Sequence, residues 1–326
     1  MASIKQLAVR GTIWTIVGYG TSQVLRFGSN LIMTRLLAPD LFGLMSLVYV
    51  FITGLQLFSD FGIAPSVIRS KRADDPDFVN TAWTLQVIRS FGIWLCCILI
   101  AYPVSQFYRE PRLLWLLPVV GLNSVLQGFA STGMYLLNRD IKIRQIAIYE
   151  ITSQLVAITV MIAWASIQPS IWALAAGSLA ASLFQMIQSH RMNPGAPNRF
   201  TWNRSALEEI ASFGQWVFLS TLLTFLASQS DRLILGKLVS FEFLGVYGIA
   251  LLLADMPKQI HDAIVNKVVF PAYTKFVELP RSEFSRKIQK ARLPLLIVFA
   301  FGIATLVGTG DLFVSVLYDD RYADAA

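Results

Sequence analysis

The stretch from Leu31 to Met45 reads LIMTRLLAPDLFGLM, and a similar stretch, LILGKLVSFEFLGVY, follows at Leu233 to Tyr247, 202 residues later. Under this one shift, charged, glycine and tryptophan positions agree without a gap over roughly fifty residues. The matched pairs are Trp14 with Trp216, Arg35 with Lys237, Leu36 with Leu238, Asp40 with Glu242, Gly43 with Gly245 and Asp60 with Asp262. Agreement of such positions at one offset indicates a duplication.

The composition is that of a membrane protein. The chain has 326 residues, of which 55% are hydrophobic and 14% are charged, whereas an average soluble domain is about 25% charged. A membrane-spanning helix needs about 20 mainly apolar residues, and nine stretches meet that length. We expect them at 11–37, 41–68, 79–102, 113–137, 143–167, 171–188, 210–238, 243–270 and 293–316. The sequence therefore predicts an all-α polytopic membrane protein.

The basic residues predict which side of the membrane each connection faces. Cytoplasmic connections carry an excess of Lys and Arg, and this rule is satisfied if the N-terminus is inside. The outer connections then hold only Arg35, Arg109, Arg112, Lys237 and Arg321. The formal charge of +7 is thereby explained by cytoplasmic loops, and no nucleic acid is expected as a partner.

The longest connection divides the chain into two lobes. It contains RMNPGAPNRF, whose Pro, Gly and Asn residues are typical of a flexible loop. We expect a six-helix lobe at 1–190, a cytoplasmic linker at 191–206 and a second, partial lobe of three helices at 207–326. Because six is even, both copies start on the same side, which predicts parallel repeats related by an axis along the membrane normal. By this symmetry the second lobe lacks about three helices, so we expect the chain to be a fragment or a truncated product.

Two segments that precede apolar runs are mixed in polarity and end in arginine, at 77–89 and 280–292. We interpret them as amphipathic extensions at the cytoplasmic interface. Arg89 and Arg292 would then snorkel toward the headgroups.

Polar residues inside the predicted spans form stripes. An ionisable group at a span centre costs about 2.5 to 3.5 kcal/mol, so it faces a bundle interior or a hydrated cavity. Gln23, Arg26 and Asn30 share one helix face, because their spacing is i, i+3, i+7. The remaining candidates for substrate binding are Arg232 in the seventh span and Asn123 and Gln127 in the fourth. For the amide stripes, interhelical hydrogen bonding within a lobe is an equally open interpretation.

Three acidic residues, Asp60, Glu150 and Asp262, are candidates for ion coupling. Asp60 and Asp262 lie near the cytoplasmic edge, where they could instead cap helices or pair with basic loop residues. The neighbouring Cys96 and Cys97 have no metal-ligand or disulfide spacing. No loop is long enough for an enzyme's catalytic groups, and no motif calls for a metal or a cofactor.

Four segments resemble those of a known family. They are TRLLAPDLFGL at 34–44, SDFGIAPSVIR at 59–69, SDRLILGKLVSFEFLGVYGIA at 230–250 and VVFPAYTKF at 268–276. In this order and spacing they resemble the bacterial oligosaccharide flippases, the polysaccharide transporter branch of the multidrug/oligosaccharidyl-lipid/polysaccharide superfamily. The resemblance covers nearly the whole chain.

The resemblance implies two bundles of six helices around a central cavity in the bacterial inner membrane. The implied substrate is a polyprenyl pyrophosphate carrying a short glycan, which moves from the inner to the outer leaflet for O-antigen, capsule or exopolysaccharide synthesis. Arg26 would be the first candidate for the pyrophosphate and Arg232 the second. Polysaccharide polymerase and chain-length proteins would be partners.

Three alternatives stay open at this stage. A multidrug or cation antiporter of the same superfamily would share the fold. A polytopic glycan polymerase or ligase is disfavoured by the short outer loops. A non-transporting assembly subunit is favoured only by the expected truncation.

Overall fold

A computed structural model describes residues 4–60, 62–70, 72, 75–140, 142–193, 195, 197–264 and 281–325. Within these ranges only the backbone is described for some stretches, among them 4–16, 211–220 and 281–292. The described chain is helical, and it divides into two compact units, 1–244 and 245–326, each of which is taken by itself below.

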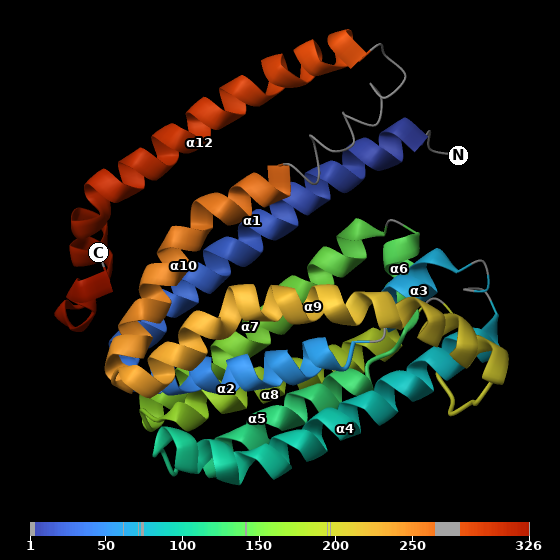
Figure 1. Cartoon of the computed structure of the whole chain (residues 1–326), viewed down its shortest axis with the longest axis horizontal. Coiled ribbons are helices and arrows are strands. Elements are labelled where there is room, and N and C mark those ends of the chain that lie inside the picture. The colour runs from blue at the N-terminus through green and yellow to red at the C-terminus, as the bar shows by residue number, and fades with distance from the viewer. Residues whose placement is uncertain are drawn as a thin grey trace. The chain divides into compact units, whose positions relative to one another are not determined.

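The described chain is a succession of helices (Figure 1). The first unit contains α1 (Ile4–Leu36), α2 (Pro39–Phe58), α3 (Ile63–Arg69), α4 (Pro76–Tyr108), α5 (Leu113–Gly128), α6 (Gly133–Arg139), α7 (Ile143–Ile167), α8 (Ile171–Arg191) and α9 (Arg204–Leu238). The unit boundary falls inside α10 (Phe241–Ile264), which is followed by α12 (Arg281–Leu317) and the 3₁₀ helix η2 (Asp320–Ala325).

Several helices are long and apolar enough to cross a membrane. In the described ranges these are α2, α4, α7, α8 and the part of α12 from Phe299 to Leu317; the bent pair of α5 and α6 would make a sixth span. The helices α1, α9 and α10 have 33, 35 and 24 residues and carry several of the polar residues singled out above. The prediction of an all-α polytopic membrane protein is confirmed.

The helix boundaries follow the sequence repeat. α1 ends at Leu36 and α9 ends at Leu238, while α2 begins at Pro39 and α10 begins at Phe241. Both pairs of boundaries are separated by the 202 residues that align the two sequence copies. The local structure thus agrees with a duplication, and the parallel relation of two lobes stays a prediction.

Small residues let helices of the first unit approach closely. A Cβ added at Gly18 of α1 would lie 2.8 Å from the Cβ of Ala147 on α7. One turn further along α1, Ser22 Oγ donates to Gln154 Oε1 at 2.7 Å. α7 also packs on α8, and α5 packs on both α4 and α8. Close backbone contact and interhelical hydrogen bonds are the usual means of helix association in a membrane.

Helix α9 packs against α2 and α4, so it belongs to the first unit (Figure 1). The ring of Phe225 lies 5.0 Å from that of Phe58 and covers Gly54, where an added Cβ would be 3.0 Å from the ring. At the other end of α9, Tyr108 Oη donates to the Leu233 carbonyl at 3.1 Å. These contacts place α9 with the helices before the linker. The expected lobe boundary in the linker stays a prediction.

The end of the predicted linker, 197–203, is held along α4. Backbone N–H groups at alternate residues donate to side chains of α4, as extended backbone with a period of two allows. The pairs are Arg199 with Asn80 Oδ1, Thr201 with Thr84 Oγ1 and Asn203 with Thr81 Oγ1, each at 3.1 Å. Hydroxyl and amide acceptors on another helix thus satisfy three backbone donors of this stretch. That the whole linker is flexible stays a prediction.

A small apolar cluster joins α3, α4 and α9 beside the linker segment 197–203. It consists of Ile63, Val67, Phe78, Ala82, Ala206 and Ile210. At its edge Arg72 bridges to Asp75 at 2.9 Å and lies 3.8 Å from Glu209. The hydrogen bond from Arg72 holds the pKa of Asp75 below its usual value. Apolar packing and ion pairs thus fix the beginning of α9 to the first unit.

The second unit consists of most of α10, α12 and η2. The described η2 helix packs on α12, and the buried ring of Tyr322 lies 6.0 Å from the ring of Tyr318. The backbone of α12 is helical from Arg281, so the described part of the predicted 280–292 extension continues directly into the span.

Candidate functional site

The C-terminal end of α2 is capped by an arginine from α4. The last carbonyls of a helix have no partner within the helix. Arg89 Nη2 donates to the Gln56 carbonyl at 2.5 Å, and its Nε donates to Ser59 Oγ at 3.1 Å. Its Nη1 also lies 3.8 Å from Asp60 Oδ1, and the side chain is 21% exposed. The expectation that Arg89 snorkels to the headgroups is therefore wrong, because the end of α2 and the two residues after it offer two acceptors and a counter-charge.

The C-terminal end of α5 is capped by a glutamine from α4. Gln86 Nε2 donates to the carbonyls of Gln127, Gly128 and Ala130 at 3.2, 3.0 and 3.1 Å. Its Oε1 in turn accepts a hydrogen bond from Tyr135 Oη at 2.8 Å. Gln86 thereby holds the chain where α5 gives way to α6.

These two caps explain why two predicted spans are broken. The predicted span 41–68 ends at Phe58 and resumes as the short α3, and the predicted span 113–137 bends by 63° between α5 and α6. Non-helical backbone at membrane depth is tolerated where other groups satisfy it. Gln86 and Arg89 are three residues apart, so they lie on one face of α4. The prediction of two unbroken spans is wrong because α4 supplies the missing hydrogen bonds.

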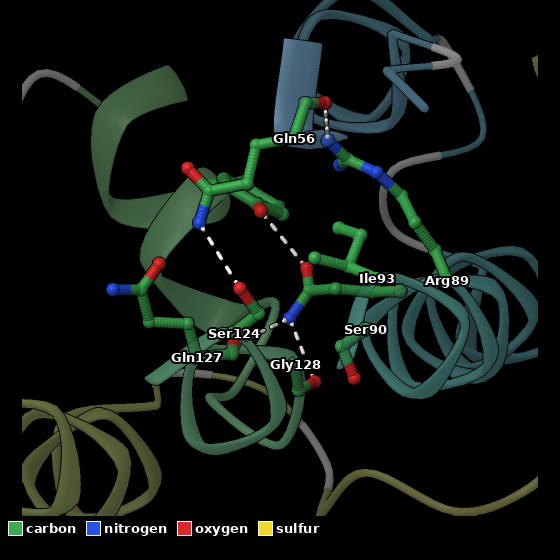
Figure 2. Close-up of a pocket in the computed structure, with 9 residues that line it drawn as sticks. Gln56, Arg89, Ser90, Ile93, Ser124, Gln127 and Gly128 are labelled. Atoms are coloured by element: carbon green, nitrogen blue, oxygen red, sulfur yellow. Dashed lines mark hydrogen bonds between the residues drawn. The ribbon is translucent and has the colours of Figure 1, made fainter. Parts of the chain in front are cut away.

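A polar pocket lies where these capped ends meet, between α2, α4, α5 and α6 (Figure 2). Its volume is about 210 Å³. It is lined by Gln56, Gln86, Arg89, Ser90, Ile93, Ser124, Gln127, Gly128 and Tyr135. Figure 2 shows the guanidinium of Arg89 turned toward the backbone of Gln56. Most of the lining groups are amides and hydroxyls.

Among the residues expected to bind substrate, Gln127 is the one that the structure brings to this pocket. Asn123, one turn earlier on α5, is buried and donates to Ser178 Oγ on α8 at 3.0 Å. Its Oδ1 is buried without a hydrogen-bond partner in the part of the chain that the structure describes. Asn123 therefore lies at a helix contact beside the pocket, as the interhelical interpretation anticipates.

The stripe on α1 remains a separate group of residues. Arg26 is exposed, and its Nη1 lies 3.5 Å from Gln23 Oε1. Asn30 lies on the same flank of the helix, next to the face whose Gly18 and Ser22 meet α7. The stripe thus lies beside the α1–α7 contact, and none of its three residues is among those that line the pocket.

The remaining candidates lie on other helices. Arg232 Nη1 on α9 lies 3.4 Å from Gln229 Oε1, and Glu150 is exposed on α7. Asp60 accepts from the Gly62 N–H at 2.9 Å and faces Arg89. Asp262 lies within α10, and its side chain is outside the described residues, as is that of Arg292. No group of three His, Cys, Asp or Glu residues in the searched ranges could hold a metal ion.

Sequence reasoning missed the residues of α4 that build the pocket. Gln86, Arg89, Ser90 and Ile93 follow i, i+3, i+4, i+7 spacing and so share one helix face. That signal was present, but an amphipathic helix at an interface produces the same pattern. Only the position of the ends of α2 and α5 shows that this face of α4 lines a pocket and is not the polar face of an interfacial helix.

The helices and the pocket define the class of protein as a multi-pass, all-α membrane protein with a hydrogen-bonding pocket among its spans. Comparison with known families is more specific. The model of a family described as polysaccharide biosynthesis proteins matches residues 32–326. The chain therefore belongs to this family, which confirms the resemblance found in the sequence.

Individual relatives agree with the family. The chain is 22% identical over 284 residues to the lipopolysaccharide biosynthesis protein WzxC of Escherichia coli, covering 84% of this chain and 56% of that protein. It is 20% identical over 321 residues to the succinoglycan biosynthesis transport protein ExoT of Rhizobium meliloti, covering 97% and 63%. The teichuronic acid biosynthesis protein TuaB of Bacillus subtilis is 19% identical over 281 residues, covering 83% and 56%.

The chain thus spans between half and two thirds of the length of these relatives. No solved structure matches it.

Proposed function

We propose that the full-length protein translocates a polyprenyl-pyrophosphate-linked oligosaccharide from the cytoplasmic to the outer leaflet, by alternating access, for surface polysaccharide biosynthesis. The observation that carries this proposal is the family match over residues 32–326. The names of two relatives, a lipopolysaccharide biosynthesis protein and a succinoglycan transport protein, support it. In this proposal the protein is a transporter and not an enzyme.

The chemistry of the described helices supports the same function. A glycan needs hydrogen-bonding groups along its path through hydrocarbon, because polar groups without partners are costly there. The pocket offers amides and hydroxyls from three membrane helices and from α6. The lipid tail needs no such path, since it can stay in the bilayer.

The pyrophosphate needs a cation, and Arg26 is the first candidate. Arg26 is exposed on α1, with Gln23 and Asn30 on the same flank. Arg232 is the second candidate, on the repeat-related helix α9. Asp60, Glu150 and Asp262 are proposed for ion coupling; of these, Asp60 is paired with Arg89.

The proposed location is the bacterial cytoplasmic membrane, with the N-terminus inside. The distribution of Lys and Arg between the connections supports this orientation. Polysaccharide polymerase and chain-length proteins are the proposed partners, because they use the translocated product.

Replacing Arg26 tests the proposal. In a strain that lacks its own copy of the gene, full-length protein carrying Arg26→Ala should abolish surface polysaccharide without lowering the amount of protein in the membrane. Arg26→Lys should restore part of it, because a cation remains. Surface polysaccharide is measured by gel analysis of cell extracts, and protein by immunoblotting of membranes.

Arg191→Ala provides the matched control, because Arg191 is an exposed arginine at the end of α8. It should leave surface polysaccharide unchanged. Normal polysaccharide with Arg26→Ala would show that the pyrophosphate is not held by Arg26.

A further inference from the structure

We propose that the pocket between α2, α4, α5 and α6 binds one uncharged sugar residue of the translocated glycan, and that it does not bind the pyrophosphate. This inference rests on the proposed function. It assigns the pocket's amides and hydroxyls to the glycan and leaves the anionic part of the substrate to another region of the protein.

The electrostatics of the pocket disfavour an anion. The donors of Arg89 are directed at the Gln56 carbonyl, Ser59 Oγ and Asp60, so its charge is partly compensated by a carboxylate 3.8 Å away. The C-terminal ends of α2 and α5 also lie at the pocket, and such ends carry a partial negative charge. A pyrophosphate would have to displace Asp60 and face two carbonyl ends.

The groups that remain available match sugar hydroxyls. Gln127 lines the pocket and its side chain is exposed, so its amide is accessible to a ligand. A primary amide offers two donors and an acceptor. Gln56 Nε2 donates to Ser124 Oγ at 3.3 Å, which leaves the Gln56 Oε1 and the Ser124 hydroxyl hydrogen. Ser90 Oγ donates to the Val87 carbonyl at 2.7 Å and can still accept. The pocket thus offers both donors and acceptors, as sugar hydroxyl groups require.

One apolar contact completes this arrangement. Ile93 lines the pocket beside Ser90 (Figure 2). A sugar ring has C–H groups as well as hydroxyls, so a single aliphatic side chain among polar groups suits it better than it suits an ion. A metal cation is disfavoured because the residues that line the pocket include an arginine and no carboxylate.

The size of the pocket restricts the ligand to one residue. Its volume of about 210 Å³ is below the roughly 300 Å³ at which pockets for drug-sized ligands begin. It is nevertheless large enough for several water molecules. One sugar ring fits this range, and a chain of several rings does not. The rest of the glycan would extend beyond the opening.

The inference is tested by comparing two lipids. Full-length protein in lipid nanodiscs is titrated with the polyprenyl-pyrophosphate oligosaccharide extracted from the cells that carry the gene, and with bare polyprenyl pyrophosphate. Bound lipid is measured by native mass spectrometry. The variant Gln127→Leu should weaken binding of the sugar-bearing lipid about fivefold to tenfold, because it removes the hydrogen bonds of one amide. It should leave binding of the bare lipid unchanged, which also verifies that the variant is folded.

Gln106→Leu is the matched control, since Gln106 is exposed on the same helix as Gln86 and does not line the pocket. It should bind both lipids as the wild type does. If Gln127→Leu weakens the binding of both lipids equally, or of neither, the assignment of the pocket to a sugar is wrong while the proposed function stands. If the wild type binds neither lipid, the proposed function fails and this inference fails with it.

Discussion

At the scale of single residues, two side chains of α4 determine the shape of the neighbouring helices. Gln86 caps α5 and Arg89 caps α2, each by donating to backbone carbonyls at a helix end. Such carbonyls have no partner within their own helix. In a bilayer such carbonyls cannot turn to water. The two breaks therefore depend on residues that are distant from them in the sequence.

Replacing Arg89 should reveal this dependence. Arg89→Gln removes the charged donors to Gln56 and Ser59 and leaves Asp60 without its counter-charge. We expect a loss of about 2 kcal/mol or more in the free energy of unfolding, because hydrogen bonds to charged groups contribute about 1.5 to 3 kcal/mol. The melting temperature of the purified protein in detergent measures the effect.

The exposed Arg191 again offers the comparison, because Arg191→Gln removes the same charge without a buried partner. That variant should melt like the wild type. Equal melting temperatures for the two variants would mean that the contacts of Arg89 add nothing to stability.

At the scale of elements, glycines set the distances between helices. A Cβ added at Gly177 of α8 would lie 2.1 Å from Met161 Cγ and 2.9 Å from the Ala157 carbonyl oxygen on α7. A Cβ added at Gly92 of α4 would meet no atom within 4 Å. These two helical glycines therefore differ in their surroundings although both lie in apolar sequence.

Alanine at these two positions should change the free energy of unfolding in different ways. Gly177→Ala forces α7 and α8 apart, and such overpacking costs about 1 to 3 kcal/mol of unfolding free energy. Gly92→Ala should leave stability unchanged or raise it by up to about 1 kcal/mol, because alanine favours the helix. Thermal unfolding in detergent, followed by circular dichroism, compares the two variants. A Gly177→Ala protein as stable as Gly92→Ala would contradict the close α7–α8 packing.

The end of the linker is also bound to a helix. Its residues 199, 201 and 203 bind α4 through their N–H groups, although its composition is that of a loop. Composition describes what a segment can do when it is isolated. Whether its backbone finds hydrogen-bond acceptors depends on the position of Asn80, Thr81 and Thr84, which lie more than a hundred residues earlier in the sequence.

At the scale of the whole molecule, the positive charges make the orientation testable. With the N-terminus inside, the connection between α4 and α5 faces outward and the connection between α8 and α9 faces the cytoplasm. A single cysteine is introduced as Pro111→Cys or Gly195→Cys, after replacement of Cys96 and Cys97 by alanine; both positions are exposed.

A membrane-impermeant maleimide should label the cysteine at position 111 in intact spheroplasts. The cysteine at position 195 should react only after the membrane is permeabilised. The reverse pattern would invert the topology and place the capped helix ends on the outer side.

The sequence by itself determined that this is a helical membrane protein, approximately where its long helices lie, and to which family it belongs. These properties depend on local hydropathy and on ordered motifs, such as the two copies at Leu31 and Leu233. Gln127 could be singled out in the same way, because a polar residue in an apolar span is conspicuous.

Only the tertiary structure decided which polar residues meet. It put Arg89 against the end of α2, Asn123 against Ser178 and the linker against α4, and it placed α9 with the first unit. Each contact joins residues far apart in the chain. Its partner is chosen by the packing of whole helices, which the hydropathy of any one segment does not contain.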